Sequence, residues 1–427
     1  MRRSVVRTVL SLVITSATAQ VAYAQPASCT TVGQNLYVRD VMTDLYLWYA
    51  EIPDLDPALF DSPEAYLEAV RYRPLDSTFS YITSRAASEA FFSNSQFIGF
   101  GLSTSLTSAG MRVLQVFPES PAEEAGLSRG DRIEALDGVA IPELVATGRI
   151  DEAFGPSEEG VAVEVAWLTL AGERRSARLV KRLVTIPTVS LTRVYEVDGR
   201  RVGYIFFRNF VEPSTEALDA AFNDLNAAGI DDLVLDLRYN GGGLVQVARH
   251  LGSLIGGVRT RGQVFAEYFH NDKNAFRNRT LRFEDPPNAG VLQRLIVITT
   301  RASASASELI INALRPFMPV VVIGDRTYGK PVGQYAIGFC DKLLAPVAFV
   351  LRNAVGDGSY FDGFPPDCAA PDDADRQLGD PAEASLREAL TFAATGACSP
   401  GARGLQRLEP AREAQRLRGW RALVNAY

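Results

Sequence analysis

Residues 231–255 read DDLVLDLRYNGGGLVQVARHLGSLI and hold three structural signals in succession. Residues 231–238 form a short, mostly apolar run, which is typical of a strand buried on both faces. Three glycines follow at 241–243, and residues 244–255 have the apolar spacing of a helix. A buried strand that passes through a glycine turn into a helix indicates helices packed on a largely parallel sheet.

The same alternation continues along the chain on both sides of this stretch. Further strands and helices are predicted from VGYIFFRNF (202–210), STEALDAAFNDLNAAG (214–229), LIVITT (295–300), SASELIINAL (305–314) and VVVIG (320–324). We therefore assign residues 186–398 to an α/β domain.

Two segments of different texture precede this domain. Residues 25–95 are rich in aromatic side chains and favour helices, so we expect a helical N-terminal domain. Residues 96–185 combine short apolar runs with recurring turn residues, which predicts a small strand-rich domain. At the other end, residues 399–427 are rich in arginine, and we expect a solvated tail or helix there.

Residues 1–24 have the pattern of a secretory signal peptide. A basic start at Arg2, Arg3 and Arg7 precedes a mostly apolar stretch, and residues 22–24 read AYA, a small-residue cleavage signal. We expect an exported, periplasmic protein without a transmembrane segment in the mature chain. Cleavage would remove three arginines and no acids, moving the net charge from −7 to −10, which argues against a nucleic-acid partner.

The cysteines and histidines limit the chemistry that the chain can perform. Four cysteines in an exported protein can form two disulfides in three ways. The pairs that we expect are Cys340–Cys368 and Cys29–Cys398. Because the chain has two histidines and no CxxC pair, we expect no metal site and no cofactor.

Neither histidine is placed like the base of a Ser-His-Asp triad. His250 lies within the helix predicted after the glycines, and His270 lies in a polar stretch that is predicted to be flexible. A packed or solvent-facing role is expected for both.

A serine at a strand-to-helix turn is the first candidate for chemistry. Ser305 follows the strand LIVITT and opens an apolar helix, where unpaired N–H groups carry positive potential. A hydroxyl there can act as a nucleophile, with the N–H of Ala306 stabilising an oxyanion. The alternative is structural, because Ser305 and Glu308 also fit a capping box that only begins a helix.

The glycine turn is the second candidate. Bare amides at 241–243, before a helix, can bind a phosphate or a developing oxyanion. A dinucleotide fingerprint is disfavoured because Gln246 stands where its third glycine should be. A plain tight turn is the structural alternative.

Lys330 lies in GDRTYGKP (324–331), which fits the phosphate-binding pattern GxxxxGK[ST] except for its last position. Pro331 replaces the required hydroxyl, and QYAIGF (334–339) predicts a strand where that motif needs a helix. A buried lysine is the other interpretation. Lowering its pKa from ~10.4 by about three units costs about 4 kcal/mol, which an apolar environment can impose. A neutral amine could then accept a proton from a serine hydroxyl.

Residues 99–102 (GFGL) and 120–138 (SPAEEAGLSRGDRIEALDG) resemble a PDZ domain. The resemblance implies that Gly99, Phe100, Gly101 and Leu102 form a carboxylate-binding loop beside a strand edge that pairs with a peptide. If the glycines served only a tight turn, no ligand would be implied.

DLRYNGGG, SASASE and TYGKPVGQ, in this order after the PDZ-like stretches, resemble the carboxyl-terminal processing or tail-specific proteases. The resemblance implies an α/β core of the Clp protease and crotonase type with an inserted PDZ-like domain. It also implies Ser305 as the nucleophile, Lys330 as the general base and Gln334 as the residue that orients the lysine.

The resemblance further implies oxyanion donors from Gly242 or Gly243 and from Ala306. One departure is Pro331, since many members have glycine after the lysine. Proline removes an N–H group and fixes φ, which affects the loop and the cleft shape but leaves the proton chemistry intact.

We therefore expect an exported serine endopeptidase with a Ser305/Lys330 dyad that acts on polypeptides recognised by their free C-terminal ends. One alternative is a non-catalytic peptide or ligand binder that keeps the fold, and another is a nucleotide-using enzyme built on GDRTYGK. The sequence does not indicate an adaptor, an oligomeric state, or whether the PDZ-like domain activates or inhibits.

Overall fold

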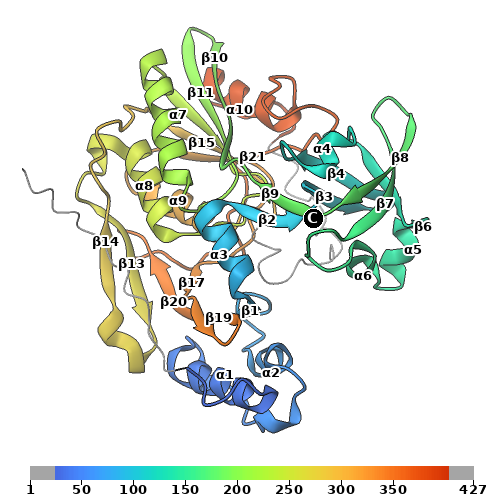
Figure 1. The fold of residues 1–427 in the computed structure, drawn as a ribbon. Coiled ribbons are helices and arrows are strands. Elements are labelled where there is room, and N and C mark those ends of the chain that lie inside the picture. The colour runs from blue at the N-terminus through green and yellow to red at the C-terminus, as the bar shows by residue number, and fades with distance from the viewer. Residues whose placement is uncertain (1–24, 403–427) are drawn as a thin grey trace, which may run out of the picture.

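The computed structural model describes residues 25–402. A six-stranded sheet forms the centre of the fold (Figure 1). Adjacent strands of this sheet run parallel, except for the first two, which are antiparallel. In spatial order the strands are β10 (Val189–Val197), β11 (Arg200–Phe207), β12 (Asp232–Asp236), β15 (Leu295–Thr299), β16 (Val320–Gly324) and β21 (Cys368–Ala369). The predicted α/β core is thereby confirmed.

Helices cover both faces of this sheet (Figure 1). One face packs against three helices, α7 (Ser214–Ala228), α8 (Val245–Gly256) and α9 (Ala306–Leu314), and the other packs against α10 (Ala384–Thr395). Alternation along each strand explains the two cores, because successive side chains point to opposite faces. In β12, Leu233 and Leu235 belong to the first core and Val234 to the second, and all three are fully buried.

Two smaller sheets extend from the central one. The first has the order β14 (Arg279–Arg282), β13 (Val264–His270), β20 (Val347–Arg352) and β17 (Val332–Gln334). The second has the order β1 (Tyr81–Ser84), β19 (Lys342–Ala345) and β18 (Ile337–Phe339). The prediction of a flexible stretch around His270 is wrong, since this residue ends β13 and pairs with Phe349 of β20.

The N-terminal segment contains helices and one strand that joins the rest of the protein. Its helical elements are α1 (Thr31–Leu45), η1 (Tyr49–Glu51), η2 (Pro57–Leu59), α2 (Pro63–Val70) and α3 (Arg85–Asn94). β1 pairs with β19 from Tyr81 opposite Ala345 to Ser84 opposite Lys342. In addition, η4 (Asp272–Arg277), at the end of the β13–β14 hairpin, contacts α1 through Lys273 Nζ, which donates to Thr43 O at 2.8 Å.

The strand-rich segment has a core of its own, with Trp167 and Phe100 among its buried side chains. Its sheet has the order β3 (Leu102–Thr107), β4 (Gly110–Val116), β5 (Arg132–Leu136), β7 (Ala162–Leu168) and β8 (Arg174–Val180). Around it lie the short strand β6 (Val139–Ala140) and three short helices, α4 (Pro121–Glu124), α5 (Ile141–Ala146) and α6 (Ile150–Phe154). A ribbon of β2 (Gln96–Gly99) and β9 (Arg182–Thr185) connects this segment to the central domain (Figure 1).

The two disulfides differ from the expected pairs. Cys29 is bonded to Cys340, and Cys368 to Cys398. The expected pairing is wrong because topology decides it: Cys340 lies in the turn between β18 and β19, beside the N-terminal segment. Cys368 lies on β21, and the chain returns to it after α10. The resulting Cα–Cα distances are 6.0 and 5.4 Å.

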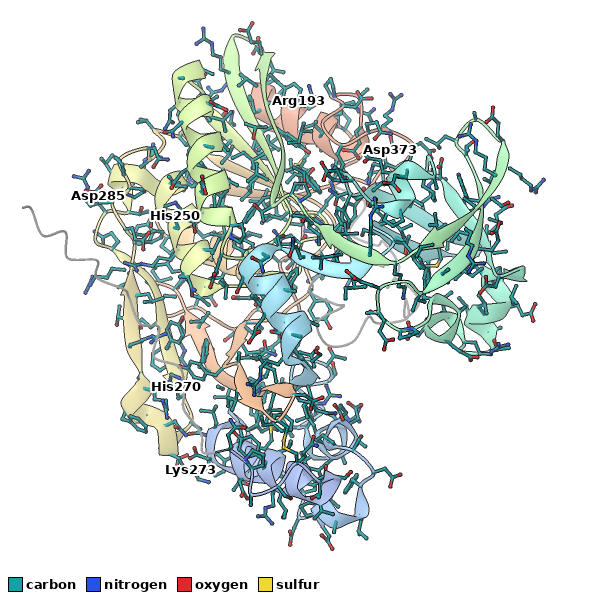
Figure 2. The ribbon with its side chains drawn as sticks, viewed as in Figure 1. Arg193, His250, His270, Lys273, Asp285 and Asp373 are labelled. Carbon is teal, nitrogen blue, oxygen red and sulfur yellow. A yellow bond between two sulfur atoms is a disulfide. The ribbon has the colours of Figure 1, made fainter. Side chains whose placement is uncertain are left out.

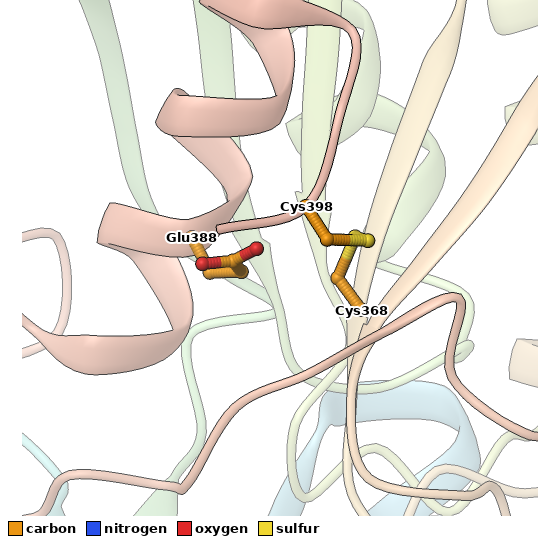
Figure 3. A group of neighbouring side chains, drawn as sticks. All are labelled: Cys368, Glu388 and Cys398. Carbon is orange, nitrogen blue, oxygen red and sulfur yellow. A yellow bond between two sulfur atoms is a disulfide. The ribbon is translucent and has the colours of Figure 1, made fainter. Parts of the chain in front are cut away.

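Glu388 of α10 lies beside the second disulfide (Figure 3). These three side chains are close enough together to suggest a metal site. However, both sulfur atoms are consumed by the bond between them, and the carboxylate accepts the N–H of Ser399 at 2.8 Å. The group therefore stabilises the end of the chain after α10.

Candidate active site

Ser305 occupies the turn between β15 and α9 in a strained backbone conformation. Its φ is +56° and its ψ is −112°, values that a non-glycine residue rarely adopts. Such strain costs roughly 1–3 kcal/mol and persists only where surrounding contacts enforce it. The side chain is partly exposed, and it faces the backbone N–H of Glu308 in a capping box. This turn therefore presents a partly exposed hydroxyl at the start of a helix.

Glu308 is the contact that holds this turn. Its fully buried carboxylate accepts the N–H of Ser305 at 2.9 Å, as expected for the capping box. It also accepts the Thr327 hydroxyl at 2.6 Å and the N–H groups of Gly329 and Lys330 at 2.7 and 2.8 Å. Burial raises the pKa of Glu308, and these four hydrogen bonds act in the opposite direction.

The predicted serine and lysine are brought together by this one carboxylate. Oε2 of Glu308 accepts the N–H groups of both Ser305 and Lys330. One oxygen atom therefore bridges the serine turn and the lysine loop. Sequence analysis assigned Glu308 only to the helix cap. Its contacts to residues 327–330 could not be predicted, because they depend on how two distant loops pack.

The same contacts contradict the phosphate-binding interpretation of GDRTYGK. The N–H groups of Gly329 and Lys330, which would have to bind a phosphate, already donate to a buried carboxylate. The strand β17 follows the loop, where the phosphate-binding motif requires a helix. An anion placed there would be repelled by Glu308.

Lys330 is buried, with 8% of its surface exposed. Burial lowers the pKa of its amine to about 8, while the negative charges of Asp76 and Glu308 act in the opposite direction. The amine forms no ion pair within the described part of the chain. Its Nζ donates to Gln334 Oε1 at 2.7 Å and lies 5.7 Å from the ring centre of Phe79.

Gln334 is held so that its oxygen faces the lysine. Its Nε2 donates to the backbone oxygens of Phe79 and, at 3.4 Å, of Ala345. Because an amide nitrogen only donates and an amide oxygen only accepts, these two carbonyls fix which end of the side chain meets Lys330. The lysine hydrogen bond is thus directed from two other segments of the fold.

Ser305 Oγ and Lys330 Nζ are not hydrogen-bonded to each other in this structure. The serine side chain faces the N–H of Glu308 in the capping box, and the lysine amine contacts Gln334. Direct proton transfer between the two groups would require these side chains to rearrange.

The glycine loop lies directly against the serine turn. A Cβ atom on Gly242 would lie 2.7 Å from Ala304 O and 2.8 Å from Ala306 N, so only glycine fits there. The N–H of Gly242 donates to Asn240 Oδ1 at 2.9 Å. In contrast, the N–H groups of Gly243 and Ala306 have no acceptor among the residues that the structure describes.

The residues predicted to bind a peptide terminus lie in the strand-rich segment, away from this turn. Phe100 is fully buried in that segment's core. Gly101 has φ of +86°, and a Cβ there would lie 2.1 Å from Ser120 Cβ, so the position requires glycine. Gly99 ends β2 and Leu102 begins β3.

Both histidines, which are labelled in Figure 2, have structural partners. His250 Nε2 lies 2.9 Å from Asp219 Oδ1, and the neighbouring carboxylate of Glu284 raises the pKa of the imidazole. His270 Nε2 lies 3.0 Å from the hydroxyl of Tyr335. Neither ring is hydrogen-bonded to Ser305.

A strained serine at a helix start, a buried lysine and a parallel α/β core place this chain with the Clp-protease-like α/β proteins. Comparison with known families makes the assignment specific. Residues 201–367 match Peptidase family S41, and residues 33–81 match the Peptidase S41 N-terminal domain. These two regions belong to that family, which confirms the resemblance to the carboxyl-terminal processing proteases.

Individual relatives agree with this assignment. The chain is 30% identical over 245 residues to the chloroplastic C-terminal processing peptidase of Tetradesmus obliquus, covering 54% of this chain and 50% of that protein. It is 28% identical over 253 residues to the carboxy-terminal processing protease CtpB of Bacillus subtilis, covering 58% and 50%. The chain thus spans about half the length of the curated relatives that it matches first.

Solved structures extend the similarity over most of the chain. A crystal structure assigned to the S41 proteases, from Bacteroides fragilis, has a TM-score of 0.66 at 26% identity and covers 84% of this chain and 96% of that one. The photosystem II D1 C-terminal processing protease shares the fold, with a TM-score of 0.51 at 23% identity, covering 80% and 93%. Across residues 25–402, no helix is both long and apolar enough to cross a membrane.

Proposed function

We propose that this protein is a serine endopeptidase in which Ser305 is the nucleophile and Lys330 the general base. The observation that carries the proposal is the shared contact to Glu308, which holds a strained serine turn beside a buried lysine of lowered pKa. A lysine with a pKa of about 8 is partly neutral near pH 7.5 and can accept a proton. Membership of two regions in peptidase family S41 supports the same reaction.

The proposed reaction proceeds in two stages. Ser305 Oγ attacks the carbonyl carbon of the scissile peptide bond while its proton passes to Lys330 Nζ. The oxyanion accepts hydrogen bonds from the N–H groups of Ala306 and of the glycine loop, where Gly243 is favoured because the N–H of Gly242 already donates to Asn240. The C–N bond then breaks, and the lysine protonates the leaving amine.

Water completes the cycle in the second stage. It attacks the ester formed with Ser305, and the neutral Lys330 accepts the proton from the water. Collapse of the second tetrahedral intermediate returns that proton to Ser305 Oγ and releases the new carboxylate. Gln334 acts as a positioning residue, since it holds Nζ between these steps.

Residues 96–185 are proposed to be a PDZ-like domain that binds the free C-terminus of the substrate. In support, the N–H groups of Phe100 and Gly101 have no acceptor within the described chain, so they are available to a carboxylate. β3 lies at the end of its sheet, which leaves one edge open to an added peptide strand. Gly99 and Leu102 flank these amides.

The remaining assignments concern compartment and domain boundaries. We propose that the protein is exported to the periplasm, an assignment supported by two disulfides, which persist in oxidising compartments. The predicted signal peptide (1–24) lies outside the described residues, as does most of the arginine-rich segment 399–427. Residues 25–95 and 186–398 are proposed as the N-terminal and catalytic domains.

The test compares cleavage of an unfolded, fluorescently labelled casein by the wild type, Ser305→Ala and Lys330→Ala. We expect both variants to lose at least about 10²-fold in rate. A peptide with a free C-terminus should be cleaved faster than its amidated form. If the wild type cleaves casein no faster than Ser305→Ala, the cleavage does not come from Ser305. That result would overturn the proposal and favour a non-catalytic peptide binder.

A further inference from the structure

Four residues of the N-terminal segment form a buried cluster next to Lys330, which we call the Asp76 cluster: Tyr46, Asp76, Phe79 and Ser80. The Asp76 carboxylate and the Tyr46 ring are fully buried, although neither belongs to the predicted catalytic set. None of the candidate residues predicted from the sequence lies in this segment. A fully buried carboxylate that contacts a catalytic region requires an explanation.

Asp76 organises the cluster through four hydrogen bonds. Its Oδ1 accepts the N–H groups of Phe79 and Ser80 at 2.8 and 2.9 Å. Its Oδ2 accepts the hydroxyls of Tyr46 and Ser80 at 2.9 and 2.5 Å. The backbone of residues 76–80 is therefore fixed in a tight turn around one carboxylate.

This turn supplies or fixes both acceptors that orient Gln334. The first acceptor is the backbone oxygen of Phe79, whose own N–H is bound by Asp76. The second is the backbone oxygen of Ala345. Two residues further on, the N–H of Val347 donates to Ser80 Oγ at 2.9 Å, and that hydroxyl donates to Asp76. Each of the two carbonyls that accept from Gln334 is thus connected to Asp76 through neighbouring hydrogen bonds.

Charge gives Asp76 a second influence on the lysine. Two carboxylates, Asp76 and Glu308, act on the Lys330 amine, and each favours its protonated form. Glu308 is saturated by four donors and lies on the serine side of the loop. Asp76 approaches from the N-terminal segment, so a separate part of the chain contributes to the pH at which the lysine becomes neutral.

We infer that Asp76 is a positioning residue for catalysis, which directs Gln334 toward Lys330 through the Phe79 and Ser80 backbone and holds the lysine amine in the field of its carboxylate. This inference rests on the proposed function, in which Lys330 is the base. It assigns the N-terminal segment a part in the active site, in addition to packing.

The sign of the expected effect follows from electrostatics. Replacing Asp76 by Asn keeps the size of the side chain and removes a negative charge that favours the ammonium form. The pKa of Lys330 should fall, and the rising limb of the pH–rate profile should move to lower pH. Because an amide cannot accept all four donors, Gln334 should also lose its alignment, and the plateau rate should fall about tenfold.

The experiment measures how fast a fluorophosphonate probe labels Ser305, and how fast casein is cleaved, between pH 5.5 and 10. Variants are Asp76→Asn, Ser80→Ala and the control Asp61→Asn, which removes an exposed carboxylate of the same segment. Asp76→Asn should lower both the midpoint and the plateau. Ser80→Ala, which keeps the charge, should lower the plateau several-fold and leave the midpoint in place.

The inference and the proposed function fail in different ways. If Lys330→Ala abolishes labelling while Asp76→Asn and Asp61→Asn share the midpoint of the wild type, the inference is overturned and the dyad stands. If Lys330→Ala labels as fast as the wild type, the dyad itself is wrong. Should Asp76→Asn not fold, an unchanged plateau in a folded Ser80→Ala variant would overturn the inference by itself.

Discussion

Two buried cations in the same domain have opposite environments. Lys330 meets one neutral amide oxygen and forms no ion pair within the described residues, and burial lowers its pKa to about 8. Arg238, which is fully buried, is paired with Asp236 at 2.7 Å and with Asp372 and Glu383 at 3.0 Å. Burial alone would lower the pKa of the guanidinium, but Asp236 and Asp372 hold it well above its usual range.

The difference shows that burial by itself does not create a reactive group. A buried charge that is fully paired stays charged and serves the structure, whereas one left with a neutral partner is driven toward its uncharged form. Arg238 follows β12 and fixes the strand end from which the glycine loop departs. Lys330 is the group whose proton can move at neutral pH.

The largest expected effect comes from replacing Lys330 by Met, which fills the same space without an amine. If the lysine is the base, the rate of casein cleavage should fall by about 10³-fold. The free energy of unfolding should stay equal or rise, because no ion pair is lost and a buried charge is removed. Urea unfolding at pH 7 beside the cleavage assay checks both. A variant that loses stability and activity together would remove the contrast with Arg238.

The same replacement at Arg238 should have the reverse outcome. Arg238→Met leaves two fully buried carboxylates and one partly exposed carboxylate without their common partner, so the protein should lose about 3–5 kcal/mol of stability. Arg174→Met, which breaks an exposed ion pair with Glu134, is the matched control and should change stability by less than about 1 kcal/mol. Urea unfolding measures both, and equal midpoints for the two variants would contradict the interpretation of Arg238.

The pH dependence of stability tests the lysine without any substrate. The pKa of Lys330 is lowered to about 8 in the folded protein, so the unfolded chain binds more protons above that pH. Stability is therefore reduced below pH 8 and regained as pH rises from about 8 to about 10.4, by about 3 kcal/mol in total. The difference in unfolding free energy between the wild type and Lys330→Met should follow this slope. A difference that stays constant with pH would show that the pKa of the Lys330 amine is not lowered in the folded protein.

Local sequence patterns were sufficient to predict the strands and helices beside the candidate site residues, whereas the catalytic roles came from the family resemblance and stay predictions. Ser305, Lys330 and Gln334 lie in short motifs between predictable strands and helices, and the parallel core followed from the apolar runs. Residues 334–339 show the limit. They were predicted to be one strand, but Gln334 ends β17 and Ile337 begins β18 in another sheet. Apolar alternation cannot indicate where a chain changes sheets.

Contacts between distant segments were beyond prediction. Cys29 and Cys340 are 311 residues apart, and no spacing rule selects that pair among three possibilities. Asp76 was not among the sequence-predicted candidates, because its proposed role depends on Gln334, which lies more than 250 residues later. Glu308 was recognised as a cap, but its bonds to residues 327–330 follow from tertiary packing.

Glu308→Gln should give the smallest of these effects. It tests whether the carboxylate that joins the serine turn to the lysine loop serves catalysis as well as stability. The Glu308 carboxylate accepts four donors on its two oxygens. The amide of Gln has only one oxygen acceptor, so its NH₂ group must face an N–H or hydroxyl group that also donates. Stability should fall by about 1–3 kcal/mol, and cleavage by about tenfold, since the serine turn and the lysine loop lose their common acceptor. Glu216→Gln, an exposed glutamate in the first turn of α7, should change neither. If Glu308→Gln alters stability alone, the carboxylate acts only as a helix cap, and another contact must align Ser305 with Lys330.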